Sequence, residues 1–413
     1  MKANWKKYIP PGLALTSLVL LSAGTTNSSR IQTTSPPELQ SFVGGSLDLA
    51  GELFPKLGKS GDNMAFSPYS LASTLAVAQA GAKGLTESQI STVGHFPADR
   101  TEHMASFKRI RKALTASDQS PGIRLATATG LWAQNGYDLE KVFLDRVRNE
   151  LGGSVNFVDF KSSANTAARQ INSWIKSNTQ GKITEGISEG SLTPATRLII
   201  ANTLYFKGDW ASRFDRSATS NRTFNVTATS SVAVPMMSQE NNFLYGEADG
   251  VQLLALPYRG QNLHMLVFLP AAGGIADFER GLNAASLQQW ADRLELCKVD
   301  VWLPRFKVVA TYSMKVPLQS LGMRDAFDAS RADFTGMSLR RPLFIQTLEQ
   351  ATVVEVNEEG TEAASATHIG FGCSAPPRPP PQQFHADRPF LFLIRENKTG
   401  AILFIGRVSN PNA

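Results

Sequence analysis

Residue types that could perform chemistry are few in this chain, and their spacing does not build an active site. The sequence lacks the GxSxG motif that presents a nucleophilic serine. The segment Leu57–Gly61, LGKSG, is a near match to a phosphate-binding loop, but Leu53 stands where that loop needs an earlier glycine. The five histidines have no metal-ligand spacing with one another; they are His95, His103, His264, His368 and His385. We therefore expect no enzyme, no metal and no cofactor.

The two cysteines, Cys297 and Cys373, are too few for a disulfide scaffold. Cys297 precedes a predicted strand and Cys373 falls in a predicted exposed loop, so we expect no bond between them. A loop cysteine could be a reactive thiol, but the sequence offers no His–Asn partner pattern of a cysteine enzyme.

The stretch from Glu355 to Ala375, EVNEEGTEAASATHIGFGCSA, has the pattern of a strand placed inside a connecting loop. No residue from Thr361 to His368 is a turn former. At period two, one face carries no charge and the other carries groups that water accepts. The uncharged face consists of Thr361, Ala363, Ser365, Thr367, Ile369 and Phe371. The following PPRPPP cannot join a sheet interior, because proline lacks the N–H donor.

This stretch resembles the hinge and reactive loop of the serpin family, whose hinge is similar to EEGTEAASAT. Other segments resemble the family in the expected order, from about residue 40 to the end of the chain. They are NMAFSPYSL (63–71), GAKGLTESQI (81–90), ANTLYFKGDW (201–210), LPYRG (256–260), LPRFK (303–307) and FHADRPFLFLI (384–394). The resemblance implies one α+β domain with helices packed around a large central mixed β-sheet and further sheets. It also implies an exposed reactive loop at about residues 358–383.

The activity implied by the resemblance is suicide inhibition of a protease. A target serine protease attacks the loop as a substrate and forms an acyl-enzyme, and the freed hinge then inserts into the main sheet as a new strand. Such a strand, from Gly360 to Cys373, would be ~45 Å long at ~3.3 Å per residue. The hinge would comprise Glu358, Glu359, Gly360, Thr361, Glu362, Ala363, Ala364, Ser365, Ala366 and Thr367.

The hinge composition separates two possible roles. Non-inhibitory serpins work as carriers, chaperones or structural proteins, and usually carry bulky or charged residues or prolines in the hinge. The small and uncharged side chains at Thr361, Ala363, Ser365 and Thr367 favour inhibition. A non-inhibitory binding or chaperone protein is the alternative.

The reactive bond is predicted by counting along the loop. The family's usual distance from Gly360 ends after Ser374, or after Cys373 if one residue is missing, and we choose Cys373–Ser374 with Ser374–Ala375 as the next choice. Counting back from Pro389 gives the bond before Pro379, where most serine proteases cut poorly. We therefore place the extra loop length in the proline-rich side, which favours an extended conformation.

The predicted target follows from the residue before the reactive bond. Cysteine behaves as a small hydrophobe, so Cys373 favours an elastase- or subtilisin-like protease, whereas cleavage after Phe371 would indicate a chymotrypsin-like one. A papain-like cysteine protease trapped in the same way is a further partner class.

The resemblance also implies a region where the main sheet parts, formed by Ser67, Ser70, Asn202, Trp210 and Gln350. Asn202 interrupts an apolar run and is either a hydrogen-bonded core amide or a member of this region. We favour the second interpretation, because Ser67 and Ser70 match neighbours of that region in the family. Gln350 stands where many serpins carry histidine, although an amide can also donate and accept.

The N-terminus has the pattern of an export signal. Residues 1–24 combine a basic start, the apolar run Leu13–Leu21 and a small-residue cleavage site. A retained anchor is the rival interpretation, although the run is short for a membrane span. Residues 25–38 have the composition of a flexible leader, and residues 39–413 would form the serpin domain. We expect a secreted protein, extracellular or periplasmic, without membrane contact after cleavage.

The overall charge argues against nucleic acid as a partner. Removal of residues 1–24, which carry three lysines and no acid, lowers the formal net charge from +6 to +3. A charge of +3 is too small to indicate nucleic-acid binding. We expect a monomer.

Apolar periodicity predicts the elements that must position the hinge. Helices are predicted over 42–54, from Pro68 to Gly81 with Ser67 as N-cap, and over 164–175. Strands are predicted at 198–206, 262–269, 299–309, 390–395 and 401–408, with a turn at 397–400 between the last two.

Overall fold

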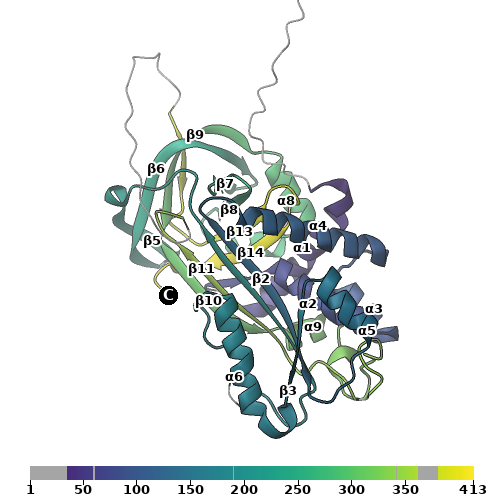
Figure 1. The fold of residues 1–413 in the computed structure, drawn as a ribbon. Helices are drawn as coiled ribbons and strands as arrows, with labels where there is room; N and C mark the ends of the chain where they lie inside the picture. Colours follow the sequence, from purple (N-terminus) through teal and green to yellow (C-terminus); the bar gives the residue numbers. More distant parts are fainter. Residues whose placement is uncertain (1–34, 59–60, 189, 341, 361–379) are drawn as a thin grey trace, which may run out of the picture. The chain divides into compact units, whose positions relative to one another are not determined.

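Helices and two β-sheets make up the part of the chain described by the computed structural model, residues 35–58, 61–188, 190–340, 342–360 and 380–413 (Figure 1). The helices are α1 (Pro37–Leu57), α2 (Pro68–Gly81), α3 (Gly84–Val93), α4 (Arg100–Asp118), α5 (Lys141–Asp145), α6 (Phe160–Asn178), α7 (Ile275–Arg280), α8 (Ala284–Ala291) and α9 (Lys315–Leu321). Shorter helical turns are η1 (Arg146–Glu150), η2 (Arg216–Ala218) and η3 (Asp325–Phe327).

The sheet that carries the hinge has the strand order β10-β11-β4-β2-β3. Its strands are β10 (Phe306–Ser313), β11 (Leu348–Val356), β4 (Leu198–Gly208), β2 (Ile123–Gln134) and β3 (Ser154–Val158). The sheet is mixed, because β11 runs parallel to β4 while β2 runs antiparallel to β4. The predicted α+β class with a mixed central sheet is confirmed.

The second sheet has the order β1-β14-β13-β8-β7-β6-β9-β12, with β5 paired to β6. Its strands are β1 (Met64–Phe66), β14 (Ile402–Val408), β13 (Phe390–Glu396), β8 (Leu263–Pro270), β7 (Val251–Pro257), β6 (Ser230–Ala248), β9 (Glu295–Pro304), β12 (Gln382–His385) and β5 (Ser220–Thr227). The predicted hairpin is confirmed, since β13 and β14 are antiparallel neighbours across the turn at 397–400.

One predicted strand is wrong. Residues 299–309 were expected as a single strand, but the chain divides at Arg305 into β9 and β10, which belong to different sheets. The apolar alternation shifts phase at Arg305, from Val299, Val301 and Leu303 before it to Phe306 and Val308 after it, and the prediction of one strand overlooked this shift. Cys297, expected just before this strand, lies within β9.

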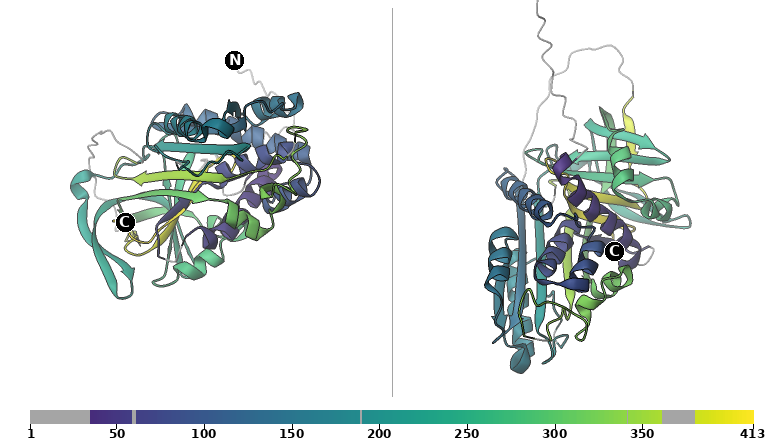
Figure 2. Two further views of the ribbon diagram at one scale, coloured as in Figure 1. Left: turned by 90° about the horizontal axis from the view of Figure 1, so that it is seen from below. Right: turned by 90° about the vertical axis from the view of Figure 1, so that its right-hand side faces the viewer.

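Helices cover both faces of the five-stranded sheet (Figure 2). On one face, Ile171 and Ile175 of α6 pack in a buried cluster with Ile199 and Ala201 of β4. On the other, α2 lies between β4 and β14, and all of its residues are buried. The continuous apolar run predicted for β4 is explained by this double cover.

Candidate functional site: hinge and seam

A seam separates the C-terminal halves of β11 and β4, the two strands that meet at the middle of the sheet. Their pairing extends only from Leu348↔Ile200 to Ala351↔Thr203. Beyond it, β11 remains paired with β10 and β4 with β2. Between 352–356 and 204–208, all within the described residues, no ladder joins the two strands. Their facing edges therefore offer backbone groups to a further strand.

Gln350 lies in the paired part of β11, next to the start of the seam. Its side-chain Oε1 accepts a hydrogen bond from Ser67 N–H at 2.9 Å, and its Nε2 donates to Ser67 C=O at 3.0 Å. Ser67 is the N-cap of α2, and its Oγ accepts from Ser70 N–H at 3.0 Å. One buried amide thus links β11 to the start of the helix beneath the sheet.

Asn202 lies opposite Gln350 in the strand register. Its Nδ2 donates to Thr129 Oγ1 of β2 at 2.8 Å. Three other buried polar atoms here have no hydrogen-bond partner within the part of the chain that is described: Ser70 Oγ, Asn202 Oδ1 and Thr203 Oγ1. A buried polar atom without a hydrogen-bond partner costs free energy.

Trp210 marks the open end of the seam, away from Gln350. Its backbone N–H donates to Glu359 C=O at 2.8 Å, its indole Nε1–H donates to Asn357 C=O at 3.0 Å, and its ring stacks on Tyr258 at 4.6 Å. The five residues predicted as one sheet-opening region therefore divide into two clusters. Ser67, Ser70, Asn202 and Gln350 surround the paired end, and Trp210 holds the hinge at the other.

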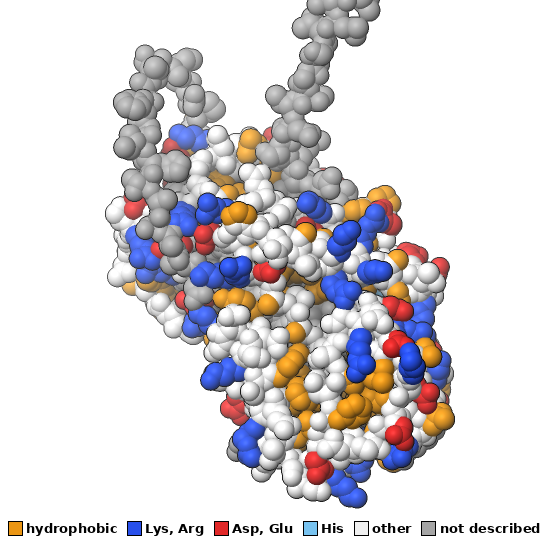
Figure 3. Space-filling view, in the orientation of Figure 1, with side chains coloured by type: hydrophobic (Ala, Val, Ile, Leu, Met, Phe, Trp, Pro, Cys, Tyr) orange, Lys and Arg blue, Asp and Glu red, His pale blue; other side chains and the backbone are white. Residues whose placement is uncertain are grey.

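Two hinge carboxylates are paired with cations. Glu358, whose side chain is 2% exposed, accepts hydrogen bonds from Arg305 Nε at 2.7 Å and from Thr219 Oγ1 at 2.6 Å. Burial alone would raise the pKa of Glu358, but the hydrogen bonds from Arg305 and Thr219 outweigh it and hold that pKa below its usual value. Glu359 forms an ion pair with Arg216 of η2. Lys and Arg side chains are prominent on this part of the face in Figure 3, over β5, β6 and β10.

Gly360 makes the turn that reverses the chain. Asn357 and Gly360 exchange backbone hydrogen bonds of 2.9 and 3.2 Å. Gly360 has φ +133°, and a Cβ added there would lie 2.1 Å from Gly208 C=O. Glycine is thus required both by the conformation and by the close approach to β4.

The remaining predicted site residues lie outside the described residues. They are hinge positions Thr361, Glu362, Ala363, Ala364, Ser365, Ala366 and Thr367 and reactive-bond positions Cys373, Ser374 and Ala375. The predicted loop, 358–383, ends within β12. The sequence analysis did not predict the hinge partners Arg216, Thr219 and Arg305. Of these, only Arg305 lies in a segment that resembles the serpin family, LPRFK (303–307).

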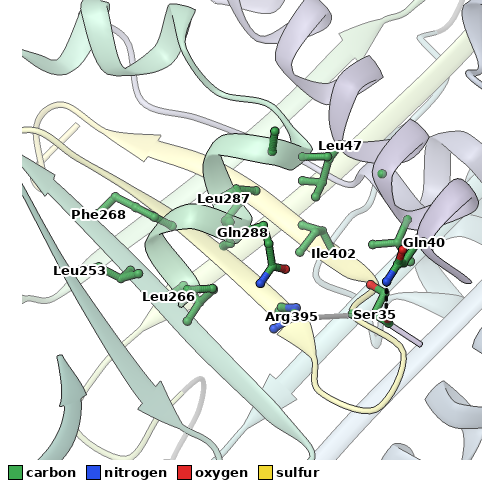
Figure 4. Close-up of a pocket in the computed structure, with 17 residues that line it drawn as sticks. Ser35, Gln40, Leu47, Leu253, Leu266, Phe268, Leu287, Gln288, Arg395 and Ile402 are labelled. Carbon is green, nitrogen blue, oxygen red and sulfur yellow. Dashed lines mark hydrogen bonds between the residues drawn. The ribbon is translucent and has the colours of Figure 1, made fainter. Parts of the chain in front are cut away.

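A second concave site lies away from the hinge (Figure 4). It is a pocket of about 310 Å3 between α1, α8 and the nine-stranded sheet. Apolar side chains dominate its lining, including Leu47, Leu266, Phe268 and Leu287, with Arg395 of β13 as its charged member. Burial lowers the pKa of Arg395 to about 10, which still leaves the guanidinium charged at neutral pH.

Among the described residues, no cluster of three or more His, Cys, Asp or Glu side chains could hold a metal ion. No helix there has both the length and the apolar character needed to cross a membrane.

Comparison with known proteins agrees with this geometry. The profile of the family Serpin (serine protease inhibitor) matches residues 45–411. An uncharacterized serpin-like protein of Thermococcus kodakarensis is 38% identical over 87% of this chain and 83% of its own length. The leukocyte elastase inhibitor of Homo sapiens is 36% identical over 84% of this chain and 93% of its own length.

Solved structures show the same fold. Uncleaved ovalbumin superposes with a TM-score of 0.80 at 28% identity, over 90% of this chain and 100% of its own. Human thyroxine-binding globulin complexed with thyroxine superposes with a TM-score of 0.80 at 27% identity, over 91% of this chain and 99% of its own. The fold and the profile match define the class of serpin-fold proteins. The chain belongs to the serpin family, whose members act on target proteases.

Proposed function

We propose that this chain is a suicide-substrate inhibitor of serine proteases and not an enzyme. A protease cleaves the loop at Cys373–Ser374 or Ser374–Ala375, remains esterified to the hinge side, and is carried along as the hinge inserts into the sheet. The observation that carries the proposal is the seam between β11 and β4, which is unpaired beyond Ala351 and Thr203.

The topology at the seam suits an inserting strand. β11 and β4 are parallel, and the turn at Asn357–Gly360 reverses the chain next to the open end. A strand continuing from Gly360 would therefore run antiparallel to both neighbours and could bond to each. Antiparallel ladders are slightly more stable per residue than parallel ones.

The energy available for insertion is large compared with a single contact. Ten or more new backbone hydrogen bonds at ~1 kcal/mol each would form. Burial of the uncharged Thr361-to-Phe371 face would add ~5–8 kcal/mol at ~25 cal/mol per Å2. Ordering of the loop offsets part of this gain. The uncharged hinge side chains matter because an unpaired buried charge would cost several kcal/mol.

Loop cleavage with thermal melting tests the proposal. The protein is incubated with elastase, subtilisin, chymotrypsin and papain, and each mixture is run on a denaturing gel. We expect an SDS-stable complex with a serine protease of the elastase or subtilisin type. We also expect the loop-cleaved protein to melt at a much higher temperature than the intact one. Loop cleavage that yields no SDS-stable complex and leaves the melting temperature of the protein unchanged would contradict the proposal.

We further propose that the protein is secreted, on the strength of the pattern in residues 1–24. N-terminal sequencing of protein recovered from the periplasm and the medium tests this. A mature start near residue 25 is expected, and a chain that retains Met1 in the membrane fraction would refute it. The mature inhibitor is proposed to act as a monomer without nucleic acid.

Carriage of a small apolar acid is a second candidate function. It is favoured by the pocket lined by Leu47, Phe268 and Arg395 and by the likeness to thyroxine-binding globulin. Thyroxine and a fatty acid would be tested by fluorescence titration. Binding that Arg395→Met weakens would support carriage, and no saturable binding would exclude it for these ligands.

A further inference from the structure

Trp302 lies at the centre of a three-layer stack that joins three strands. The ring of His385, the last residue of β12, lies 3.8 Å from the Trp302 ring with an interplanar angle of 11°. The guanidinium of Arg222, on β5, lies 3.5 Å from the same ring. Two groups this close to one ring cannot share a face, so Trp302 of β9 is sandwiched between them. Asp300 Oδ2 lies 3.0 Å from His385 Nε2 and fixes the ring from the side.

β12 needs such side-chain support because its backbone pairing is short. It lies at the sheet edge and pairs with β9 only from Gln382↔Val299 to His385↔Trp302, in parallel. Gln382 and Gln383 are exposed, while Phe384 is buried. Apart from the stack, Gln252 Nε2 donates to Gln383 C=O at 3.0 Å. Just after the strand, Ala386 N–H donates to Trp302 C=O at 2.9 Å and Asn225 N–H of β5 donates to Asp387 C=O at 2.7 Å. A four-residue parallel edge strand contributes little stability alone.

The segment Arg216–Arg222 contacts both ends of the reactive loop. Arg216 and Thr219 bind the hinge carboxylates of Glu359 and Glu358. Three residues after Thr219, Arg222 stacks on Trp302 and so supports β12, where the far end of the loop rejoins the sheet. Three residues of extended chain span about 10 Å. One short segment therefore holds the loop's entry and exit close together.

Chain length makes this attachment important. The hinge strand from Gly360 to Cys373 would extend ~45 Å along the seam, whereas residues 374–381 reach at most ~29 Å at ~3.6 Å per residue. While β12 stays on the sheet, an uncleaved loop cannot insert as far as Cys373. Cleavage removes this limit. Detachment of β12 would also remove it, without any protease.

We propose that Arg216–Arg222 acts as one strap that fastens both ends of the loop, with Arg222, Trp302 and His385 as its positioning residues. The strap keeps the intact loop outside the sheet. Loss of its contacts with the hinge carboxylates weakens the attachment of β12, and loss of the Arg222–Trp302 contact weakens the attachment of the hinge. This inference rests on the proposed insertion mechanism for its consequence, although the strap itself can be tested without it.

Hydrogen exchange on the full-length, uncleaved protein tests the strap directly. The variants are Trp302→Leu, Arg222→Gln and Thr219→Val, with Lys298→Gln as the matched control, since Lys298 lies on β9 in a surface ion pair with Glu240. Trp302→Leu removes both ring contacts of the stack, whereas Arg222→Gln removes only the cation–π contact. We expect amides of residues 382–385 to exchange about tenfold faster in Trp302→Leu and several-fold faster in Arg222→Gln. The control should match the parent protein.

The coupling and its consequence have separate readouts. Thr219→Val alters only the hinge contact, so faster exchange in β12 would support coupling, and parental exchange would overturn it. During days at 37 °C, Trp302→Leu should become resistant to loop cleavage and gain melting temperature faster than the parent. If Trp302→Leu does not fold, Arg222→Gln carries the test, and parental β12 exchange in both refutes the strap. If cleavage of the parent protein leaves its melting temperature unchanged, the insertion mechanism fails, while the exchange result still decides the strap.

Discussion

Gln350 and Ser67, far apart in the sequence, are joined by two hydrogen bonds between one side-chain amide and one residue's backbone N–H and C=O. Both residues are buried. The pair fixes β11 to the N-cap of α2 where the seam begins. Opening of the sheet between β11 and β4 therefore moves a strand that this amide holds in place.

Replacement of Gln350 by methionine should destabilise the intact protein by about 2–3 kcal/mol, because Ser67 N–H would be buried without an acceptor. Urea unfolding of the uncleaved protein measures the loss. Glu355→Gln is the control, since Glu355 lies on the same strand in a partly exposed ion pair with Lys307 worth at most ~1 kcal/mol. Equal stability of Gln350→Met and the parent would show that the amide is dispensable.

Replacement of Glu358 by glutamine should reveal the hinge clamp through its pH dependence. The pKa of Glu358 is below its usual value in the folded protein, so its stabilisation is complete above the unfolded-state pKa, about 4.3. It is lost as the pH falls through the lower folded value. We expect Glu358→Gln to be about 1–2 kcal/mol less stable than the parent at pH 7. This difference should vanish in strong acid.

Urea melts from pH 3 to 8 check the hinge prediction. Glu240→Gln, which removes a surface pair with Lys298, should differ little from the parent at any pH. A pH-independent difference for Glu358→Gln would contradict an ionic role for Glu358.

His103 should make the protein sensitive to mild acid. It is fully buried between Phe96 at 4.1 Å and Phe42 at 5.6 Å, and neither ring nitrogen has a partner among the described residues. Burial, with a contribution from Arg100, lowers its pKa to about 4. The unfolded value is about 6.5, so stability is full above pH 6.5 and falls as the pH drops toward 4.

Replacement of His103 by leucine should flatten this pH dependence. Burial likewise lowers the pKa of His264 to about 4, so we expect about half of the slope to remain. Melting temperatures between pH 4 and 7.5 provide the measurement, with His95→Gln at a partly exposed site as the control. An unchanged slope in His103→Leu would rule out His103 as the source.

Thr361→Arg should convert the inhibitor into a substrate. The arginine would have to enter the sheet at the first step of insertion, where an unpaired charge costs several kcal/mol. Hydrolysis of the acyl-enzyme would then outrun insertion. The assay is the ratio of SDS-stable complex to cleaved protein. Glu362→Gln, on the opposite face by period two, should keep the complex, and a stable complex with Thr361→Arg would contradict the argument.

The local sequence predicted most of the elements and the family. The apolar run at 198–206 predicted the doubly covered strand β4, Ser67-Pro68 predicted the start of α2, and EEGTEAASAT indicated the serpin family. These features depend on period, capping chemistry and residue order, all of which lie within a few residues of one another.

Only the tertiary structure decided which of these elements meet. Residues 299–309 belong to two sheets that divide at Arg305. Trp210 lies at the hinge end of the seam and not beside Gln350, and Arg305 pairs with Glu358. Apolar alternation is the same whichever strand becomes the neighbour, so it cannot encode pairing between distant segments. The unpaired seam between β11 and β4 is a relationship of this kind, and it exists only once the whole sheet has formed.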